Sequence, residues 1–67
     1  MDKQTLTRDI KQEIGCWPTT SDIARYLGKS RDYVRNLMAG TDALVSNRRR
    51  QYMAGDVADR IMAQREM

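Results

Sequence analysis

Residues 19–40 read TTSDIARYLGKSRDYVRNLMAG, with the spacing of two short helices joined by a tight turn. Ile23 and Leu27 lie four residues apart, so on a helix they share one face and can enter a core. The small Ala24 beside them lets a second helix cross closely, and Gly28 follows four residues later, where the turn needs a positive φ. This spacing predicts a helix-turn-helix over residues 19–39.

The ends of the two helices carry their own signals. Thr19 and Asp22 form an acceptable capping pair for the start of the first helix, and Ser30 is a good N-cap for the second. Three apolar residues of the second helix have the i, i+3, i+4 spacing of a buried face: Val34, Leu37 and Met38.

The second helix then has an outward face rich in hydrogen-bond donors. We expect this face to consist of Ser30, Arg31, Asp32, Tyr33, Arg35 and Asn36. A helix that reads the major groove of DNA presents such a face. The alternative is a helical hairpin with an ordinary solvated face. DNA binding is favoured because the small residue, the glycine and the two apolar residues occur in register, together with a capped start and a basic outer side.

Individual roles follow from side-chain chemistry. Arg31 and Arg35 lie four residues apart on one face and are candidates to bind guanine O6 and N7, while Asn36 can pair with adenine N6 and N7. Asp32 belongs to the same predicted recognition set. Contacts to phosphates that fix the register are expected from Lys29, Ser30 and Tyr33.

The positive charge is concentrated in the middle of the chain. The 67 residues carry a net charge of +3. Between Arg25 and Arg50 there are seven basic and two acidic residues, against five basic and seven acidic residues in the remainder. A polyanion as the partner explains this asymmetry better than general solubility does.

Other classes of function lack the residues they need. The sequence has no histidine, no Gly-rich phosphate loop and no plausible nucleophile pair, so we expect neither an enzyme nor a metal or other cofactor. Cys16 is the single cysteine and allows no internal disulfide. Because no apolar run resembles a signal or a membrane span, we expect cytoplasmic residence, associated with the nucleoid of a prokaryote or with a phage.

Amphipathic helices are predicted on both sides of this pair, within a single domain over 1–67. Apolar residues that repeat every four positions predict a first helix over about 3–14, with Gly15 as its natural stop. Apolar residues at helical spacing predict a last helix over 55–66, with Asp56 favourably placed at its N-terminus.

Residues 43–53 are interpreted as a β-hairpin wing. Runs suited to strands occur at 43–45 and 51–53, and a polar, turn-forming segment joins them. The tip of the wing is expected to carry Asn47, Arg48, Arg49 and Arg50. Three arginines at a tip can track a phosphate backbone or reach into the minor groove. The alternative is a solvated basic loop.

Several other residues are assigned to the core. Trp17 is favoured as a core residue over a base-stacking group, because the chain is poor in large apolar side chains. Cys16 is expected to be a small buried residue, and methionines such as Met53, Met62 and Met67 are expected to fill gaps in the core.

The run from Asp22 to Met62 resembles the small winged helix-turn-helix domains of phage and mobile-element excisionases and of MerR-like regulators. Residues 23–38 look like the helix pair of these domains, Leu44 follows at the family's spacing, and residues 52–57 look like the entry to their last helix. The resemblance implies a recognition helix in the major groove and a wing on the backbone or the minor groove. It carries over to Arg31, Tyr33, Arg35, Asn36 and Arg48 through Arg50.

The expected fold is mainly α with a small β-hairpin, a winged helix-turn-helix of three helices, a two-stranded wing and a C-terminal helix. The expected function is sequence-specific binding of double-stranded DNA by an excisionase-like architectural factor. A small transcriptional regulator with the same binding mode and a winged-helix protein-interaction module are the alternatives. A second copy at an adjacent site, a recombinase and RNA polymerase are further candidate partners, and no membrane is expected.

Overall fold

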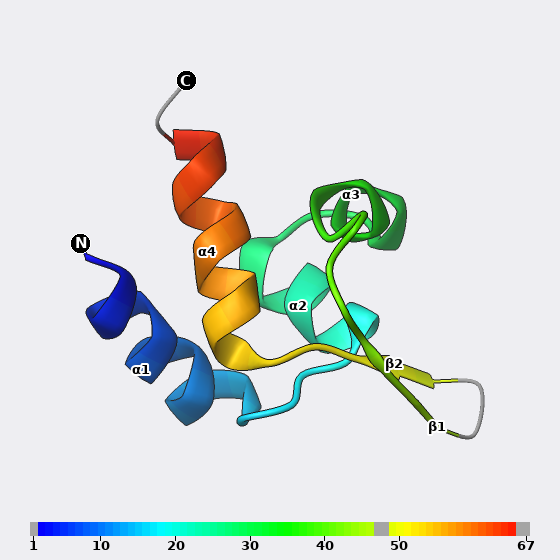
Figure 1. Cartoon of the computed structure of the whole chain (residues 1–67), viewed down its shortest axis with the longest axis horizontal. Helices are drawn as coiled ribbons and strands as arrows, with labels where there is room; N and C mark the ends of the chain where they lie inside the picture. Colours follow the sequence, from blue (N-terminus) through cyan, green and yellow to red (C-terminus); the bar gives the residue numbers. More distant parts are fainter. Residues whose placement is uncertain (1, 47–48, 66–67) are drawn as a thin grey trace.

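The computed structural model describes residues 2–46 and 49–65. These residues form four helices and one two-stranded antiparallel sheet, in the order α1 (Lys3–Ile14), α2 (Thr20–Leu27), α3 (Arg31–Leu37), β1 (Leu44–Ser46), β2 (Arg49–Gln51) and α4 (Ala54–Arg65) (Figure 1). A mainly helical chain with a small hairpin is thus confirmed. The last helix begins one residue earlier than predicted, at Ala54, and its predicted end at Glu66 lies outside the described residues.

Helix α1 begins and ends where its sequence predicts. The carboxylate of Asp2 accepts a hydrogen bond from the backbone N–H of Thr5 at 2.7 Å, and this contact holds the pKa of Asp2 below its ordinary value. Gly15, at a φ of 97°, ends the helix. Leu6 and Ile10 are buried on the side that the four-residue repeat predicts.

Helices α2 and α3 are joined by a tight turn with capped ends. The hydroxyl of Thr19 accepts from the N–H of Asp22 at 3.2 Å, and the carboxylate of Asp22 accepts from the N–H of Thr19 at 3.1 Å, which completes a capping box. Gly28 ends α2 in the left-handed region with a φ of 70°. Ser30 caps α3 by accepting from the N–H of Tyr33 at 3.1 Å. These three predicted signals are confirmed.

One core forms where the helices meet. Helix α1 lies against α4, and α2 packs on both α1 and α3 (Figure 1). The buried apolar side chains are Leu6, Ile10, Ile23, Ala24, Val34, Leu37, Met38, Tyr52, Ala54, Val57 and Ala58. Because α3 buries one side in this core, its opposite side is held toward solvent.

The strands of the hairpin have different bounds from the predicted ones. Its antiparallel pairs are Leu44–Gln51, Val45–Arg50 and Ser46–Arg49. The first strand lies one residue later than the predicted 43–45, at Leu44–Ser46. The predicted bounds of the second strand, 51–53, are wrong, since that strand begins at Arg49 and ends at Gln51. Tyr52 explains the shift, because its buried ring draws the chain out of the hairpin and into the core.

Beyond the hairpin, the chain after β2 runs antiparallel to the segment that precedes α2. The contacts are an isolated bridge between Thr19 and Gln51 and hydrogen bonds from Tyr52 N to Pro18 O at 2.9 Å and from Ala54 N to Cys16 O at 3.1 Å. Backbone atoms thus hold the base of the hairpin against the start of α2.

This pairing exposes residues that the sequence assigned to the core. In an extended pair, successive side chains point to opposite sides. Pro18 and Tyr52 are buried, so Trp17 and Met53 point outward and have 45% and 50% of their surface exposed. Cys16 is exposed as well. The core predictions for Trp17, Met53 and Cys16 are therefore wrong.

The other methionines follow the prediction where they are described. Met38 is buried, and Met62 is partly buried and packs against the core. Met67 lies outside the described residues.

Candidate nucleic-acid interface

Helix α3 presents one polar face to solvent. Its buried side consists of Val34 and Leu37, with the half-buried Tyr33 beside them. The exposed residues have the i, i+1, i+4, i+5 spacing of a single helical face: Arg31, Asp32, Arg35 and Asn36. At about 100° per residue they occupy roughly 140° of the circumference of the helix. Four of the predicted recognition residues therefore share one surface.

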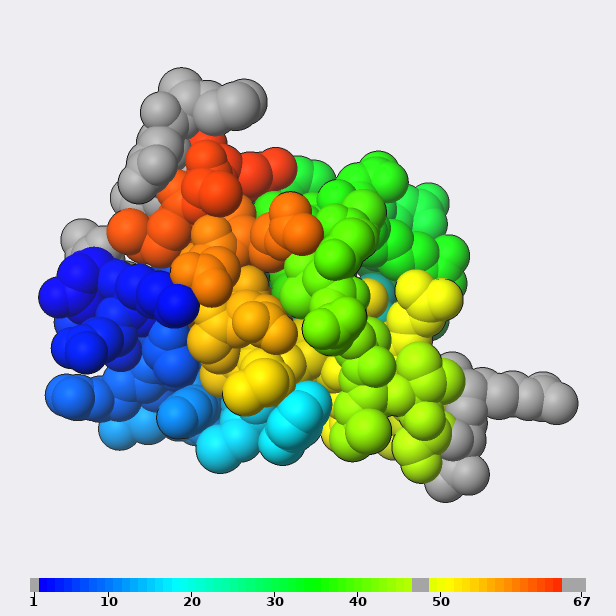
Figure 2. Space-filling model, in the orientation of Figure 1, coloured from blue at the N-terminus to red at the C-terminus, as the bar shows by residue number. Residues whose placement is uncertain are grey.

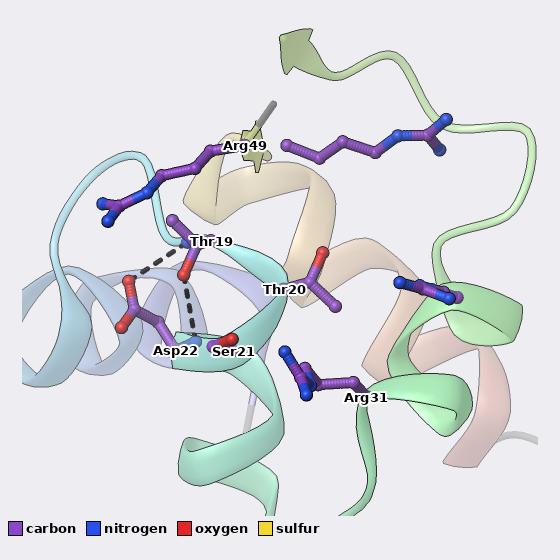
Figure 3. Close-up of a pocket in the computed structure, with 8 residues that line it drawn as sticks. Thr19, Thr20, Ser21, Asp22, Arg31 and Arg49 are labelled. Atoms are coloured by element: carbon purple, nitrogen blue, oxygen red, sulfur yellow. Dashed lines mark hydrogen bonds between the residues drawn. The ribbon is translucent and has the colours of Figure 1, made fainter. Parts of the chain in front are cut away.

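This surface opens onto a groove that two other elements share. The groove holds about 680 Å³ and lies between the start of α2, α3 and β2 (Figure 3). Its lining residues are Thr19, Thr20, Ser21, Asp22, Arg31, Arg35, Arg49 and Arg50. The fold thus gathers arginines from a helix and from a strand around one opening, which we call the arginine groove.

Acidic side chains neutralise little of the charge of the arginine groove. Nη1 of Arg35 lies 3.8 Å from Oδ1 of Asp32, and 70% and 90% of these two side chains are exposed. An exposed pair at this distance contributes little. Within residues 2–46 and 49–65, Arg31, Arg49 and Arg50 take part in no ion pair. The groove therefore presents positive charge to a ligand.

The first turn of α2 supplies polar groups that the sequence reasoning missed. Thr20 and Ser21 line the arginine groove, and the first backbone N–H groups of a helix have no partner within the helix. Asp22 lines the groove too, but one oxygen of its carboxylate is engaged by the N–H of Thr19. The sequence feature that could have identified Thr20 and Ser21 is their position directly after the predicted N-cap.

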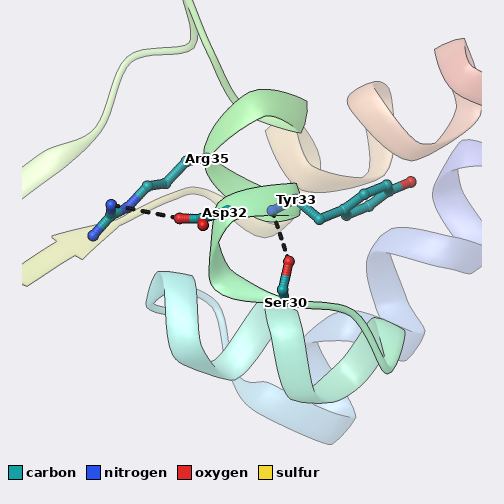
Figure 4. Close-up of polar contacts among 4 residues, drawn as sticks. All are labelled: Ser30, Asp32, Tyr33 and Arg35. Carbon is teal, nitrogen blue, oxygen red and sulfur yellow. Dashed lines mark hydrogen bonds and ion pairs between the residues drawn. The ribbon is translucent and has the colours of Figure 1, made fainter.

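Tyr33 lies on a different side of α3 from the arginines. It packs against the core, and its hydroxyl donates to the side-chain oxygen of Gln64 in α4. Figure 4 shows its ring directed away from Asp32 and Arg35. The Nζ of Lys29 lies 5.5 Å from the centroid of this ring, a cation–π contact. The prediction that Tyr33 points outward is wrong, because an aromatic ring gains more by packing than by facing solvent.

The arginines of the hairpin reach the groove from a strand rather than from a tip. Arg49 and Arg50 lie in β2, so their predicted place in the turn is wrong, yet both line the arginine groove. Figure 3 shows Arg49 beside the first turn of α2. In the space-filling view the described residues of the hairpin lie at one edge of the molecule (Figure 2). Asn47 and Arg48, the other predicted wing residues, lie outside the described residues.

Arg60 of α4 holds the connection that follows α3, outside the lining of the arginine groove. Its Nε donates to Oγ1 of Thr41 at 2.7 Å, and its Nη2 donates to the carbonyl of Ala39 at 3.0 Å. Both acceptors belong to the connection between α3 and β1. The sequence reasoning missed Arg60, since one arginine among the polar residues of an amphipathic helix carries no distinguishing signal.

No group of three or more potential metal-binding side chains occurs in the described part of the chain. The helices within residues 2–46 and 49–65 are all too short or too polar to cross a membrane. Comparison with protein-family models, with curated proteins and with solved structures finds no match. The functional interpretation therefore rests on the arginine groove.

Proposed function

We propose that this chain binds double-stranded DNA as a winged helix-turn-helix, with α3 in the major groove and the β1–β2 hairpin as the wing. The observation that carries the proposal is the convergence of arginines from α3 and β2 on one groove. Each guanidinium is a planar fork of donors that suits phosphate and guanine alike. An extended polyanion is the kind of ligand that can contact α3 and β2 at the same time.

The size and chemistry of α3 suit the major groove. An α-helix with its side chains is about 10–12 Å across, and the major groove of B-DNA, which is about 12 Å wide, admits one. Arg31 and Arg35 are the candidates for guanine O6 and N7, and Asn36 is the candidate for adenine. Lys29 and Ser30, at the start of α3, are candidates for phosphates.

Arg49 and Arg50 are candidates for the phosphate backbone beside that groove. A single module of this kind buries about 600 to 1,000 Å² of surface on DNA, which limits its selectivity. An excisionase-like architectural factor, acting at repeated sites with a recombinase, fits such a module. A transcriptional regulator that acts with RNA polymerase uses the same interface, and the exposed Trp17 and Met53 offer either one an apolar surface for a protein partner.

Arg35→Ala tests the proposal against the matched variant Arg8→Ala. Arg8 is an exposed arginine of α1 that lies outside the arginine groove, so each variant loses one positive charge. Fluorescence anisotropy measures binding to a labelled duplex selected from a random pool. We expect Arg35→Ala to cost about 1 to 3 kcal/mol of binding free energy, and Arg8→Ala to bind like the unmodified chain.

Equal losses for the two variants would contradict a role for α3. Failure of the unmodified chain to retain any duplex at low salt would contradict DNA binding altogether. Duplex binding that does not weaken as the salt concentration rises would contradict phosphate contacts by the arginine groove, because such contacts release counterions. A steep salt dependence would speak against the alternative of a protein-interaction module.

A further inference from the structure

Asp32 is an acidic residue on the exposed face of α3. Its side chain is 90% exposed and points toward the same side as Arg35, on the side of β2 (Figure 4). A carboxylate on a surface that meets a polyanion is repelled by the phosphates. On a DNA-binding surface, a hydrogen bond accepted from the nucleic acid would offset this repulsion.

Two structural roles do not explain why this carboxylate faces the arginines. The ion pair with Arg35 is 3.8 Å long and highly exposed, so it contributes little. As an acid in the first turn of α3, Asp32 interacts favourably with the positive end of the helix dipole. Any acid in the first turn of α3 would interact with the helix dipole, so this interaction does not explain why Asp32 lies on the exposed face beside Arg31 and Arg35.

We propose that Asp32 is a specificity-determining residue that accepts a hydrogen bond from the N4 amino group of a cytosine in the major groove. This inference rests on the proposed DNA binding and assigns one base to one side chain.

The chemistry of the base edges favours cytosine. An ionised carboxylate accepts hydrogen bonds and cannot donate them. In the major groove, guanine presents N7 and O6 and thymine presents O4, and these acceptors repel a carboxylate. Adenine offers its N6 amino group beside the acceptor N7, whereas cytosine offers its N4 amino group alone. Asp32 therefore selects cytosine both by attraction to N4 and by repulsion from the other bases.

Arg35 provides the neighbouring contact. Arg35 follows Asp32 by three residues on the same exposed face of α3, so the two side chains can reach neighbouring bases. A carboxylate on cytosine N4 and a guanidinium on guanine O6 and N7 fit such adjacent positions. The preferred site should therefore contain a cytosine next to the guanine bound by Arg35.

The test compares duplexes selected from a random pool by the unmodified chain and by Asp32→Asn. We expect the unmodified chain to select a cytosine at one position, and we expect Asp32→Asn to lose that preference by about fivefold or more. The same variant should bind a duplex of random sequence more tightly, because it lacks the repelled charge. Asp32→Glu, which keeps an acceptor carboxylate, should retain the cytosine.

The control is Asp56→Asn, which removes the first-turn acid of α4, the counterpart of Asp32 in α3. It should leave the base preference unchanged while altering thermal stability as Asp32→Asn does. An identical preference at every position for Asp32→Asn and the unmodified chain would overturn the assignment while leaving DNA binding in place. If the unmodified chain retains no duplex from the pool, the proposed function fails and the assignment fails with it.

Discussion

The hydroxyl of Tyr26 in α2 donates a hydrogen bond to the carboxylate of Asp9 in α1. The two residues line a shallow groove together with Glu13, Ile14 and Arg25. Burial, followed by the hydrogen bond and the negative charge of Asp9, raises the pKa of Tyr26 to about 12 from its ordinary 10.0. Helices α1 and α2 are thus joined by a contact that needs a neutral tyrosine.

Alkaline pH should therefore weaken the fold through Tyr26. Because its pKa in the folded chain lies above 10.0, its contribution is fully present below about pH 10 and is lost as the pH rises through about 12. Urea unfolding measured across this range should show a steeper fall in the free energy of unfolding for the unmodified chain than for Tyr26→Phe. Tyr33→Phe removes a different tyrosine hydroxyl and is the control. Parallel curves for Tyr26→Phe and the unmodified chain would refute the assignment.

Arg60→Met should destabilise the chain although Arg60 does not line the arginine groove. The variant keeps much of the aliphatic stem and loses the hydrogen bonds to Thr41 and Ala39, at a cost of about 1 to 3 kcal/mol in the free energy of unfolding. Chemical unfolding followed by circular dichroism measures the difference. Arg60→Lys should recover little, because an ammonium lacks the planar fork of donors.

The matched variant for Arg60→Met is Arg8→Met, in an exposed position of α1. Its free energy of unfolding should stay within about 0.5 kcal/mol of the unmodified value. Comparable stability of the two variants would show that the hydrogen bonds of Arg60 do not hold the connection between α3 and β1.

Gly28→Ala should destabilise the turn between α2 and α3. Gly28 has a φ of 70° and no heavy atom within 4 Å of an added Cβ, so the expected cost of about 1 to 2 kcal/mol comes from the backbone alone. Gly55→Ala is the control, since Gly55 lies in α4 and its added Cβ also meets nothing within 4 Å. Helix propensity predicts that this control gains up to about 1 kcal/mol. Shifts of the melting temperature in the same direction would contradict the prediction.

Arg49→Ala should change how DNA binding depends on salt. If Arg49 contacts a phosphate, its loss makes the slope of log affinity against log salt less steep by about 0.9, and it weakens binding to different sequences to a similar degree. Anisotropy titrations at several salt concentrations measure this slope. With Arg8→Ala the slope should not change. An unchanged slope for Arg49→Ala would remove the hairpin from the phosphate contacts.

Local signals were sufficient to predict the helices. The capping box of Thr19 and Asp22, the positive φ of Gly28 and the cap at Ser30 each depend on residues within four positions of one another. The four-residue repeat of α1 predicted its bounds for the same reason. The exposed face of α3 followed from these elements, because helical spacing determines which side chains share a side.

The predictions for Trp17, Met53, Tyr33 and the second strand failed because they depend on contacts between residues far apart in the sequence. Trp17 and Met53 were assigned by apolar character, but the backbone pairing of the segments around Pro18 and Tyr52 turns them outward. The second strand ends at Gln51, directly before the buried Tyr52, and a strand pattern alone does not reveal that burial. Tyr33 is directed by its contact with Gln64, a residue far along the chain.

The antiparallel pairing of residues 16–19 with residues 51–54 has a consequence for how this chain can change over generations. Its hydrogen bonds from Tyr52 N to Pro18 O and from Ala54 N to Cys16 O join main-chain atoms, so most substitutions in either segment leave them intact. The hydrogen bond from Nε2 of Gln51 to the carbonyl of Trp17 depends on a side chain. The arginines of α3 and β2 can therefore be exchanged one at a time while the frame that places them is kept. If the proposed function holds, the binding preference could change by one substitution at a time, and each variant along the way would still fold.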